Sequence, residues 1–300
     1  MKALTVSCVG GAVLDVIYRV DQLPSSDTKL VARSRVESGG GMAANAAAAI
    51  ARLGGNARWI GRVGDDDMAN HIVSGLETSG VHVTARRICD ATSPHSIVLV
   101  DQRGDRAIVL YRSTDFDADA QWLPLDMICQ ANVVLADNRW VAGAVRALDA
   151  ARARGLPAVL DADISDDPQM ILAVKAASHV VFSEQGLAGL FGTADPLEGL
   201  KRAAVHAPFV AVTLGGAGVA WLDAERQPQH LRAFPVTARE TLGAGDVFHG
   251  AFALALAERR TESEALRFAA VTAALKCERT GGRSTFPNRS EVDERLLHTW

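Results

Sequence analysis

The stretch NVVLADNRWVAGAVRALDAARARGLPAVLDAD, residues 132–163, contains the repeating unit that decides the fold. Two short apolar runs, NVVLAD and PAVLDAD, flank the helical pattern AGAVRALDAARARG, which ends in glycine. Apolar runs of this length on either side of a helix are typical of buried parallel strands. The stretch therefore predicts a strand–helix–strand unit of an α/β sheet.

The same alternation extends over most of the 300 residues. Further strand-like runs are ALTVSCVG, ARWIGRVG, HVVFSE and FVAVTLG, and further helical patterns are GMAANAAAAIARLGG, DDMANHIVSGLETSG and DPLEGLKRAAVHA. This order predicts a mostly parallel sheet with helices on both faces. Such sheets bind ligands beyond the carboxyl ends of their strands.

Two segments, 15–40 and 93–113, are rich in strand patterns and contain no helix. The second predicts a hairpin whose two strands are joined by DQRGDR. We expect these segments to form a small β-sheet lid over the carboxyl edge of the main sheet. The predicted domains are a main α/β domain over 1–14, 38–92 and 114–300, and a lid over 15–37 and 93–113.

The composition excludes several classes of protein. The net charge is -4 and the basic residues are scattered, which argues against nucleic-acid binding. The apolar N-terminal stretch is interrupted by Asp15 and resembles a first strand rather than a signal peptide. No apolar run reaches the roughly 18–20 residues of a membrane span. The four cysteines form no CxxC pair, so we expect small buried residues in the reducing cytoplasm.

The stretch ETLGAGDVFHGAF, residues 240–252, carries the chemistry. Gly243, Ala244 and Gly245 lead into a helix, so free N–H groups and the positive end of the helix dipole point at one spot, as in an anion site. Asp246 would repel an anion there unless it had a chemical task. One fitting task is to accept a proton from a hydroxyl that attacks a phosphoryl group. A plain helix-start acid is the alternative.

Three other stretches have both a functional and an ordinary interpretation. In ESGGGMAANAAAAIARLGG, a buried Asn45 would need a partner, which a polyhydroxylated ligand could supply. The acids Asp161 and Asp163 in DADISDD could hold Mg²⁺ through water or lie in a solvated loop. We expect His249 to be a packed histidine with a structural hydrogen bond. VAVTLGGAGVAWLD predicts a strand, a glycine turn and a strand, and matches neither GxGxxG nor GxxxxGK[ST].

Together, GGGMAANAAAAIARLG and ETLGAGDVFHGAF resemble the two signatures of the ribokinase-like (phosphofructokinase-B-type) carbohydrate kinases, in the same order and separation. GRVGDDDMAN and VTLGGAGV resemble further blocks of that family, and the resemblance covers essentially the whole chain. It implies a ribokinase-like fold and ATP-dependent phosphorylation of a primary sugar hydroxyl, with Mg²⁺ as cofactor. It also implies a homodimer formed through the lid.

The resemblance assigns roles to individual residues. Asp246 matches the catalytic base, and Gly243, Ala244 and Gly245 match the anion hole. The sugar-binding positions are Asp15, Gly40, Gly41 and Asn45. The nucleotide-binding positions are Thr213, Gly215, Gly216, Gly218, Gly281, Gly282, Ser183 and Glu184.

The sequence departs from the family pattern at two places. Glu240, Thr241 and Leu242 stand where the family commonly has Asp-Thr-Thr, which leaves the use of a monovalent cation near that acid open. The family's Asn-x-x-Glu block, linked to Mg²⁺, reads SEQG here, so Ser183 and Gly186 replace Asn and Glu. Metal coordination is then expected to rely on other groups, such as Asp161 or Asp163 through water.

Within the family, LADNRW, FSEQGLA, GDVFHGA and ALKCERTGGR are most similar to the sulfofructose kinase branch. This similarity implies an anionic ketose whose sulfonate is held by Arg139 and Lys29. Leu110 stands where that branch has Asn. Either Arg112, on the same face of the strand, substitutes for it, or the substrate differs. Three alternatives remain open, namely a nucleoside kinase of the same fold, a ribose- or fructose-type kinase, and a sugar-binding regulator without catalysis.

Overall fold

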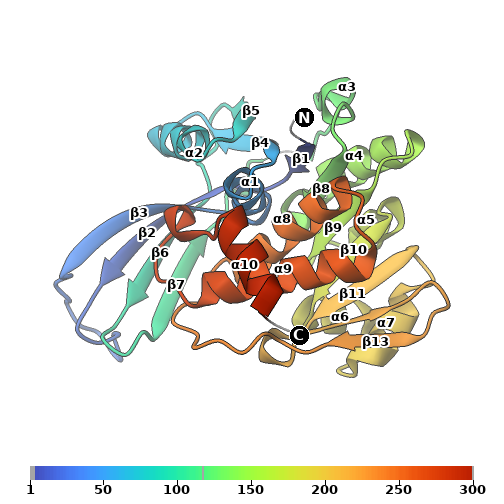
Figure 1. The fold of residues 1–300 in the computed structure, drawn as a ribbon. Coiled ribbons are helices and arrows are strands. Elements are labelled where there is room, and N and C mark those ends of the chain that lie inside the picture. The colour runs from blue at the N-terminus through green and yellow to red at the C-terminus, as the bar shows by residue number, and fades with distance from the viewer. Residues whose placement is uncertain (1–3, 117, 299–300) are drawn as a thin grey trace.

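The computed structural model describes residues 4–116 and 118–298, so the ends of the predicted main domain, 1–3 and 299–300, lie outside it. The main sheet is built from β1 (Thr5–Val9), β4 (Asn56–Gly64), β5 (His82–Ile88), β8 (Val133–Asp137), β9 (Ala158–Ala162), β10 (His179–Ser183), β11 (Phe209–Thr213), β12 (Val219–Leu222) and β13 (Pro228–Leu231). Their order is β13-β12-β11-β10-β9-β8-β1-β4-β5 (Figure 1).

The pairing is parallel from β11 through β5, and near the other edge of this sheet β12 pairs antiparallel with both β11 and β13. Parallel strands that are buried on both faces need apolar side chains throughout. β1, β8 and β9 are buried at every residue. The predicted unit over 132–163 is therefore confirmed as β8, a helix and β9.

Helices cover both faces of the main sheet (Figure 1). One apolar core lies under α1 (Met42–Arg52), α2 (Asp67–Thr78), α8 (Ala244–Ala257), α9 (Glu262–Cys277) and α10 (Arg289–His298). A second core on the other face lies under α3 (Leu125–Ile128), α4 (Val141–Ala153), α5 (Met170–Ala176), α6 (Glu184–Phe191) and α7 (Pro196–Ala203). Within the described ranges, no helix has the length and apolar character that crossing a membrane requires.

A second sheet, here called the lid sheet, stands beside the main sheet (Figure 1). It consists of β2 (Val13–Arg19), β3 (Ser34–Gly40), β6 (His95–Val100) and β7 (Arg106–Tyr111), in the order β3-β2-β6-β7. β6 and β7 form the predicted antiparallel hairpin. β2 begins at Val13 and β3 ends at Gly40, so these strands run slightly beyond the predicted range 15–37. The fold class predicted from the sequence is confirmed.

Helices α1 and α8 pack against each other at close range because the residues between them are small. A Cβ on Gly250 of α8 would clash with the main-chain oxygen of Ala46 of α1. The alanines of α1 from Ala43 to Ala49 are at most 2% exposed. This close packing places Asn45 of α1 beside Asp246 of α8.

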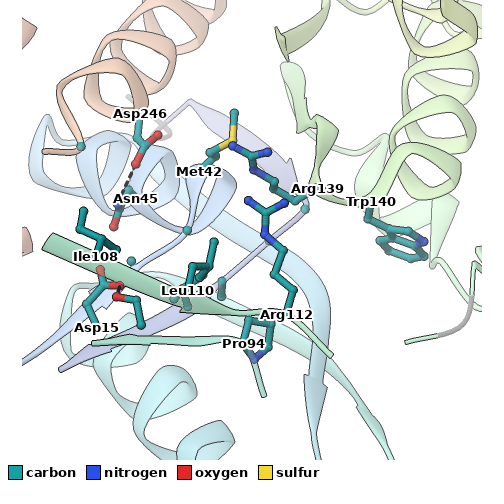
Figure 2. Close-up of a pocket in the computed structure, with 18 of the residues that line it drawn as sticks. Asp15, Met42, Asn45, Pro94, Ile108, Leu110, Arg112, Arg139, Trp140 and Asp246 are labelled. Carbon is teal, nitrogen blue, oxygen red and sulfur yellow. Dashed lines mark hydrogen bonds between the residues drawn. The ribbon is translucent and has the colours of Figure 1, made fainter. Parts of the chain in front are cut away.

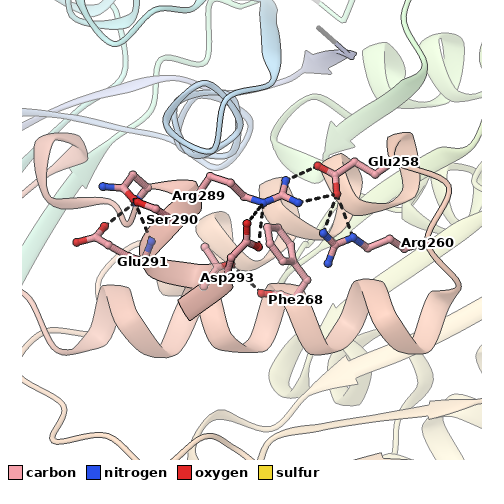
Figure 3. A network of polar contacts seen from close by, with 9 residues as sticks. Glu258, Arg260, Phe268, Arg289, Ser290, Glu291 and Asp293 are labelled. Atoms are coloured by element: carbon pink, nitrogen blue, oxygen red, sulfur yellow. Dashed lines mark hydrogen bonds and ion pairs between the residues drawn. The ribbon is translucent and has the colours of Figure 1, made fainter. Parts of the chain in front are cut away.

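The C-terminal end of α8 is held by a polar network (Figure 3). Glu258 accepts a hydrogen bond from Arg260 Nε at 3.0 Å and pairs with Arg289 of α10. Arg289 also pairs with Asp293 at 2.9 Å, and both guanidinium groups lie over the ring of Phe268, at 4.6 and 5.0 Å. These side chains are partly exposed, so each pair contributes at most about 1 kcal/mol. Their combined effect is to fix α10 against α8 and α9.

Candidate active site

A cavity of about 430 Å³, here called the main cavity, lies between the lid sheet and the carboxyl ends of the main-sheet strands (Figure 2). It brings together side chains that are far apart in the sequence. The residues of the predicted site that line it are Asp15, Gly40, Gly41, Asn45, Arg112, Arg139, Gly243 and Asp246. Two predicted groups of residues, for sugar binding and for catalysis, thus share one cavity.

A chain of hydrogen bonds crosses the floor of this cavity. Asn45 Nδ2 donates to Asp246 Oδ2 at 2.7 Å (Figure 2). Arg283 Nε donates to Asn45 Oδ1 at 2.9 Å, and Arg283 Nη2 donates to the carbonyl oxygen of Gly40 at 3.0 Å. Because both ends of the Asn45 amide are engaged, its orientation and that of the Asp246 carboxylate are fixed together.

Arg283 was missed by sequence reasoning. It lies at the start of a 3-10 turn, Arg283–Thr285, directly after Gly281 and Gly282, and this position next to two glycines was the available signal. Its burial lowers the pKa of the guanidinium to about 10, although the carboxylates of Asp15 and Asp246 act in the opposite direction. Its Nη1 atom is buried and finds no hydrogen-bond partner among the described residues.

The carboxyl group of Asp246 has a raised pKa. Burial raises its pKa to about 6, and the carboxylates of Asp137 and Asp163 act in the same direction. The hydrogen bond from Asn45 and the positive charge of Arg139 lower the pKa and oppose that rise. A carboxylate with a pKa this close to neutrality is suited to accept a proton at physiological pH.

The start of α8 has backbone geometry that is compatible with the predicted anion site. Gly243 has the left-handed backbone, with φ 74°, that glycine adopts without strain. The amide of Ala244 donates to the carbonyl oxygen of Thr241 at 3.2 Å. The amides of Gly245 and Asp246 have no hydrogen-bond partner in the part of the chain that the structure describes. Two free N–H groups and the positive end of the helix dipole therefore face one spot.

Asp15 lies on the lid side of the main cavity. Its Oδ1 atom accepts a hydrogen bond from Ser96 Oγ at 2.5 Å. Burial raises its pKa, while the Ser96 hydrogen bond and the charge of Arg283 lower it. A Cβ on Gly40 would clash with Asp15 Oδ2, so Gly40 is required for the carboxylate to take this position.

Asp137, at the end of β8, was also missed, although it ends the quoted run NVVLAD. Its Oδ2 atom accepts hydrogen bonds from the amides of Gly11 and Ala43, both at 2.8 Å. Its Oδ1 atom accepts from the amide of Arg139 at 2.9 Å. Burial raises its pKa despite these three donors. Asp137 thus joins three chain segments around the main cavity and is a structural anchor.

Two arginines approach each other at the side of the main cavity away from Asn45 (Figure 2). Arg139 pairs with Asp163 at 2.6 Å and donates to the carbonyl oxygen of Ile164 at 3.1 Å. Arg112 makes no hydrogen bond or ion pair with the described residues, and its burial together with the charge of Arg139 lowers its pKa. Lys29 is exposed in the β2–β3 connection and lines none of the cavities described here.

A third arginine, Arg62 of β4, lines the main cavity and was not predicted. Its guanidinium lies 4.3 Å from the ring centroid of Trp140 and 5.4 Å from that of Phe116. Such cation–π contacts hold a guanidinium in place. The positive charge at this side of the cavity therefore comes from three strands or strand ends.

Asp161 and Asp163 do not fit the predicted role of magnesium ligands. Asp161 is 3 % exposed, and its carboxylate lies 3.3 Å from Nδ1 of the buried His249, so it faces the interior. Both oxygens of Asp163 are engaged, one by Arg139 Nη2 and one by Ser183 Oγ at 2.8 Å. Among residues 4–116 and 118–298, no cluster of three acidic, histidine or cysteine side chains could hold a metal ion.

His249 is packed as predicted, with Nδ1 2.7 Å from the carbonyl oxygen of Gly245 and Nε2 3.1 Å from that of Val181. Its burial lowers its pKa. The ring therefore links the first turn of α8 to β10 of the main sheet. His249 thus has a structural role and does not line the main cavity, although it lies only three residues after Asp246.

The predicted nucleotide-binding residues fall into two groups. Ser183 and Thr213 are register partners at the carboxyl ends of β10 and β11, and Glu184 is exposed in the first turn of α6. Gly215 and Gly216 lie in the 3-10 turn Gly215–Ala217, followed by Gly218 with φ 105°. Gly281 and Gly282 lie elsewhere, in a second cavity of about 390 Å³ lined by Ser38 and Gly39 of the lid sheet.

The chain is similar to known kinases along its whole length. The family model described as pfkB family carbohydrate kinase matches residues 3–289. A ribokinase of Bacillus subtilis is 28% identical over 96% of this chain and 98% of its own length. A solved Agrobacterium tumefaciens structure, described as a candidate ribokinase, has a TM-score of 0.93 at 36% identity and covers 99% of this chain and 100% of its own. A solved Arabidopsis thaliana ribokinase, complexed with ribose and ATP, has a TM-score of 0.87 at 26% identity, with full coverage of both chains.

These similarities agree with the geometry of the main cavity. The cavity combines a carboxylate of raised pKa with the free amides at a helix start, under a separate small sheet. That combination suits transfer of a phosphoryl group to an alcohol. The protein belongs to the pfkB family of carbohydrate kinases and is an ATP-dependent phosphotransferase with an alcohol group as acceptor.

Proposed function

We propose that this kinase transfers the γ-phosphoryl group of ATP to a primary hydroxyl of an anionic ketose such as sulfofructose, with Asp246 as the general base. The observation that carries the proposal is the layout of the main cavity. Gly243 and Asp246, at the start of α8, line one part of it, and Arg112 and Arg139 line another (Figure 2). A sugar with a terminal hydroxyl and an anionic group at its far end matches this layout.

Asp246 would take the proton of the attacking hydroxyl as its oxygen bonds to the γ-phosphorus and the bond from that phosphorus to the ADP oxygen breaks. A pKa of about 6 keeps the carboxylate ionised at neutral pH while bringing its basicity near the operating pH. Asn45 holds Oδ2, and Oδ1 accepts no hydrogen bond from the described residues. Oδ1 is therefore the atom that we expect to meet the hydroxyl.

The phosphoryl donor ATP supplies the transferred group, and two features of this chain fit it. The free amides of Gly245 and Asp246 suit the charge that develops on the transferring oxygens. The turn from Thr213 to Gly218, at the carboxyl end of β11, lies where α/β sheets bind ligands. The Arabidopsis relative, which is described with both ribose and ATP, supports the presence of two binding regions.

The sugar hydroxyls would be held by Asp15, Asn45 and the main chain at Gly40 and Gly41. Asp15 is oriented by Ser96, and its carboxylate can accept hydrogen bonds from two hydroxyls of a ligand. The lid sheet, proposed over 15–37 and 93–113, covers this region with Val98, Ile108 and Leu110. Closure of such a lid excludes water and limits the hydrolysis of ATP.

The anionic group of the substrate would be held by Arg112 with Arg139. The two guanidinium groups repel each other, and Arg112 has no anionic partner of its own among the described side chains. A sulfonate or phosphate would relieve that repulsion and accept hydrogen bonds from a planar guanidinium fork. Lys29 remains outside the cavity, so the proposal depends on the two arginines.

The test is an assay of sugar-dependent ADP release with sulfofructose, fructose 6-phosphate, fructose, ribose and adenosine. We expect an anionic ketose to have the highest kcat/KM, and Arg112→Gln to lower kcat/KM for it by about 10–100-fold while changing the value for fructose little. The matched control is Arg103→Gln, which changes an exposed arginine at the hairpin turn. A preference for fructose or ribose, unaffected by Arg112→Gln, would contradict the anionic substrate and leave the role of Asp246 intact.

The same assay separates the remaining alternatives. Nucleoside kinases offer aromatic rings to a base, and the rings that line the main cavity, Phe116 and Trp140, lie against Arg62. Adenosine is therefore expected to be a poor substrate. A sugar-binding regulator would bind one of these sugars without releasing ADP.

We also propose that the lid sheet pairs with that of a second copy. Its face away from the main cavity exposes Ile97, Val109 and Tyr111, by 44%, 70% and 43%, and these residues are neighbours in the β6–β7 register. An apolar sheet face of this kind favours association. Val109→Glu is expected to convert a dimer into a monomer in analytical ultracentrifugation. A parent protein that is already monomeric would refute this pairing.

A further inference from the structure

Lys276, in the last turn of α9, has a buried ammonium group. Its side chain is 1% exposed, although lysine is among the residues least often buried. Lys276 Nζ donates to Glu240 Oε1 at 2.9 Å and to the main-chain oxygen of Glu240 at 3.4 Å. A buried charge persists only where a specific partner compensates its loss of water, so Glu240 defines the position of this group.

The ion pair lies at the base of the loop that leads to the anion hole. Glu240 precedes Gly243, the residue that opens α8, by three positions. The amides of Arg239 and Glu240 donate to the carbonyl oxygen of Cys277 at 2.8 and 3.2 Å. Glu240 Oε2 accepts a hydrogen bond from the amide of Gly281 at 3.3 Å. One carboxylate thus joins the end of α9, the loop before α8 and the segment before Arg283.

These links close a ring around the catalytic carboxylate. The segment that contains Gly281 continues to Arg283, which holds Asn45, and Asn45 holds Asp246. The other side of the ring runs from Glu240 through Gly243 into α8. Movement of Glu240 would therefore shift the anion hole and the base from both sides.

The atoms around Lys276 Nζ are a carboxylate oxygen and a main-chain carbonyl oxygen. These are the ligand types that hard metal cations take in proteins. The family resemblance places a monovalent cation near the acid that Glu240 replaces. Here one positive charge already neutralises Glu240, and a dissolved cation at the same oxygens would meet the ammonium group. This chain does not fit a bound monovalent ion at that place.

We propose that the Lys276 ammonium group acts as a covalently attached monovalent cation that positions the anion-hole loop through Glu240, so that this kinase needs no dissolved potassium. Lys276 is a positioning residue, because it does not line the main cavity, where we propose that the sugar and the phosphoryl group meet. Two quantities test this proposal. The rate of sugar-dependent ADP release rests on the proposed function, and the melting temperature does not.

The first experiment compares buffers that contain only tetramethylammonium, which is too large for an oxygen site, with buffers containing potassium or ammonium at equal ionic strength. For the parent protein we expect sugar-dependent ADP release and the melting temperature to stay the same, within about twofold for the rate, since screening is constant. Saturable activation of the parent protein by potassium would overturn the proposal.

The second experiment removes the attached cation. Lys276→Ala opens a space beside Glu240, and its kcat in tetramethylammonium is expected to fall by about tenfold or more, as for a displaced reacting geometry. Potassium or ammonium should restore most of kcat and raise the melting temperature, because an ion that binds the folded state stabilises it. Lys276→Met fills the space with an uncharged chain, so potassium should rescue neither quantity.

The matched control is Lys201→Ala, which removes an exposed lysine from α7 and should leave both quantities unchanged in every buffer. If Lys276→Ala does not fold, Glu240→Gln keeps the side-chain shape and removes the charge that a cation compensates, and it should lower kcat without potassium rescue. Lys276→Ala that stays folded but responds to potassium no more than Lys276→Met would refute the attached-cation role. If the melting temperature responds as expected in a protein without sugar-dependent ADP release, the proposed function fails and the cation site stands.

Discussion

Asn45 Nδ2 and Asp246 Oδ2 lie 2.7 Å apart although 201 positions separate them in the sequence. The bond joins α1 to α8, and Arg283 fixes the other end of the same amide. In the proposed mechanism, sugar binding and the position of the base are therefore coupled through the Asn45 side chain. A substitution at Asn45 or Arg283 should change how the proton is taken as well as how tightly the sugar binds.

Asp246→Asn should remove at least about 10²-fold of kcat, because the amide cannot accept the proton of the hydroxyl. Binding of the sugar and of a non-hydrolysable ATP analogue should stay close to that of the parent, since the shape of the side chain is kept. Single-turnover kinetics and calorimetric titration measure the two quantities. A variant that retains turnover within about tenfold would show that another group is the base.

The rate of the parent enzyme should fall at low pH. In the proposed mechanism Asp246 acts as the carboxylate, and its pKa is about 6, so kcat/KM should decline with unit slope below about that pH. A pH profile with an independent coupling assay at each pH measures this. An acid limb near the ordinary aspartate value of 3.8 would indicate that Asp246 does not control the profile.

The Asp246 carboxylate should lower the free energy of unfolding at neutral pH. Its pKa is higher in the folded state than in the unfolded state, so its contribution is favourable below the unfolded pKa and is lost as pH rises through about 6. Asp246→Asn should therefore be more stable than the parent at pH 8 by up to about 3 kcal/mol, and the gain should vanish near pH 4. Urea unfolding at the two pH values tests the sign.

Asn45→Ala should shift the decline of kcat/KM at low pH to a higher pH. The Asn45 hydrogen bond lowers the pKa of Asp246, so its loss should raise that pKa and shift the decline in kcat/KM to higher pH. KM for the sugar should rise as well. The control is Asn70→Ala on the exposed surface of α2, which should leave the profile in place. An unchanged limb in Asn45→Ala would contradict the coupling.

Gly40→Ala should weaken sugar binding without unfolding the protein. The new Cβ meets Asp15 Oδ2, so the Asp15 carboxylate must move, and KM for the sugar should rise by about tenfold or more. Gly189→Ala in α6 is the matched control, because its Cβ meets nothing within 4 Å. A similar KM in both variants would show that the position of Asp15 is unimportant for the sugar.

The sequence predicted the strands that are buried on both faces of the main sheet. The central strands are apolar throughout because both faces are covered, whereas β5 and β13, the two edge strands, were not predicted because their exposed faces carry polar residues. Within the candidate site, the glycine-rich stretches before Asn45 and Asp246 pointed to those two residues, whereas Asp15, Arg112 and Arg139 were assigned only through the family resemblance. Arg283 and Arg62 were missed because their role depends on which distant segment they face. For Arg283 the two preceding glycines were the available local signal, and they do not show that it faces Asn45.

Helices α1 and α8 are separated by little more than their own backbones where Gly250 meets Ala46. The distance between Asn45, which we propose holds the sugar, and Asp246, which we propose takes its proton, is thus set at positions that do not line the main cavity. A single added methyl group at Gly250 would shift α8, and Asp246 with it, relative to α1 without changing the identity of any residue that lines the main cavity. The size of sugar that this enzyme accepts can therefore change through substitutions at buried residues between α1 and α8. Variants selected for a new sugar should carry substitutions at these small buried residues as well as among the residues that line the main cavity.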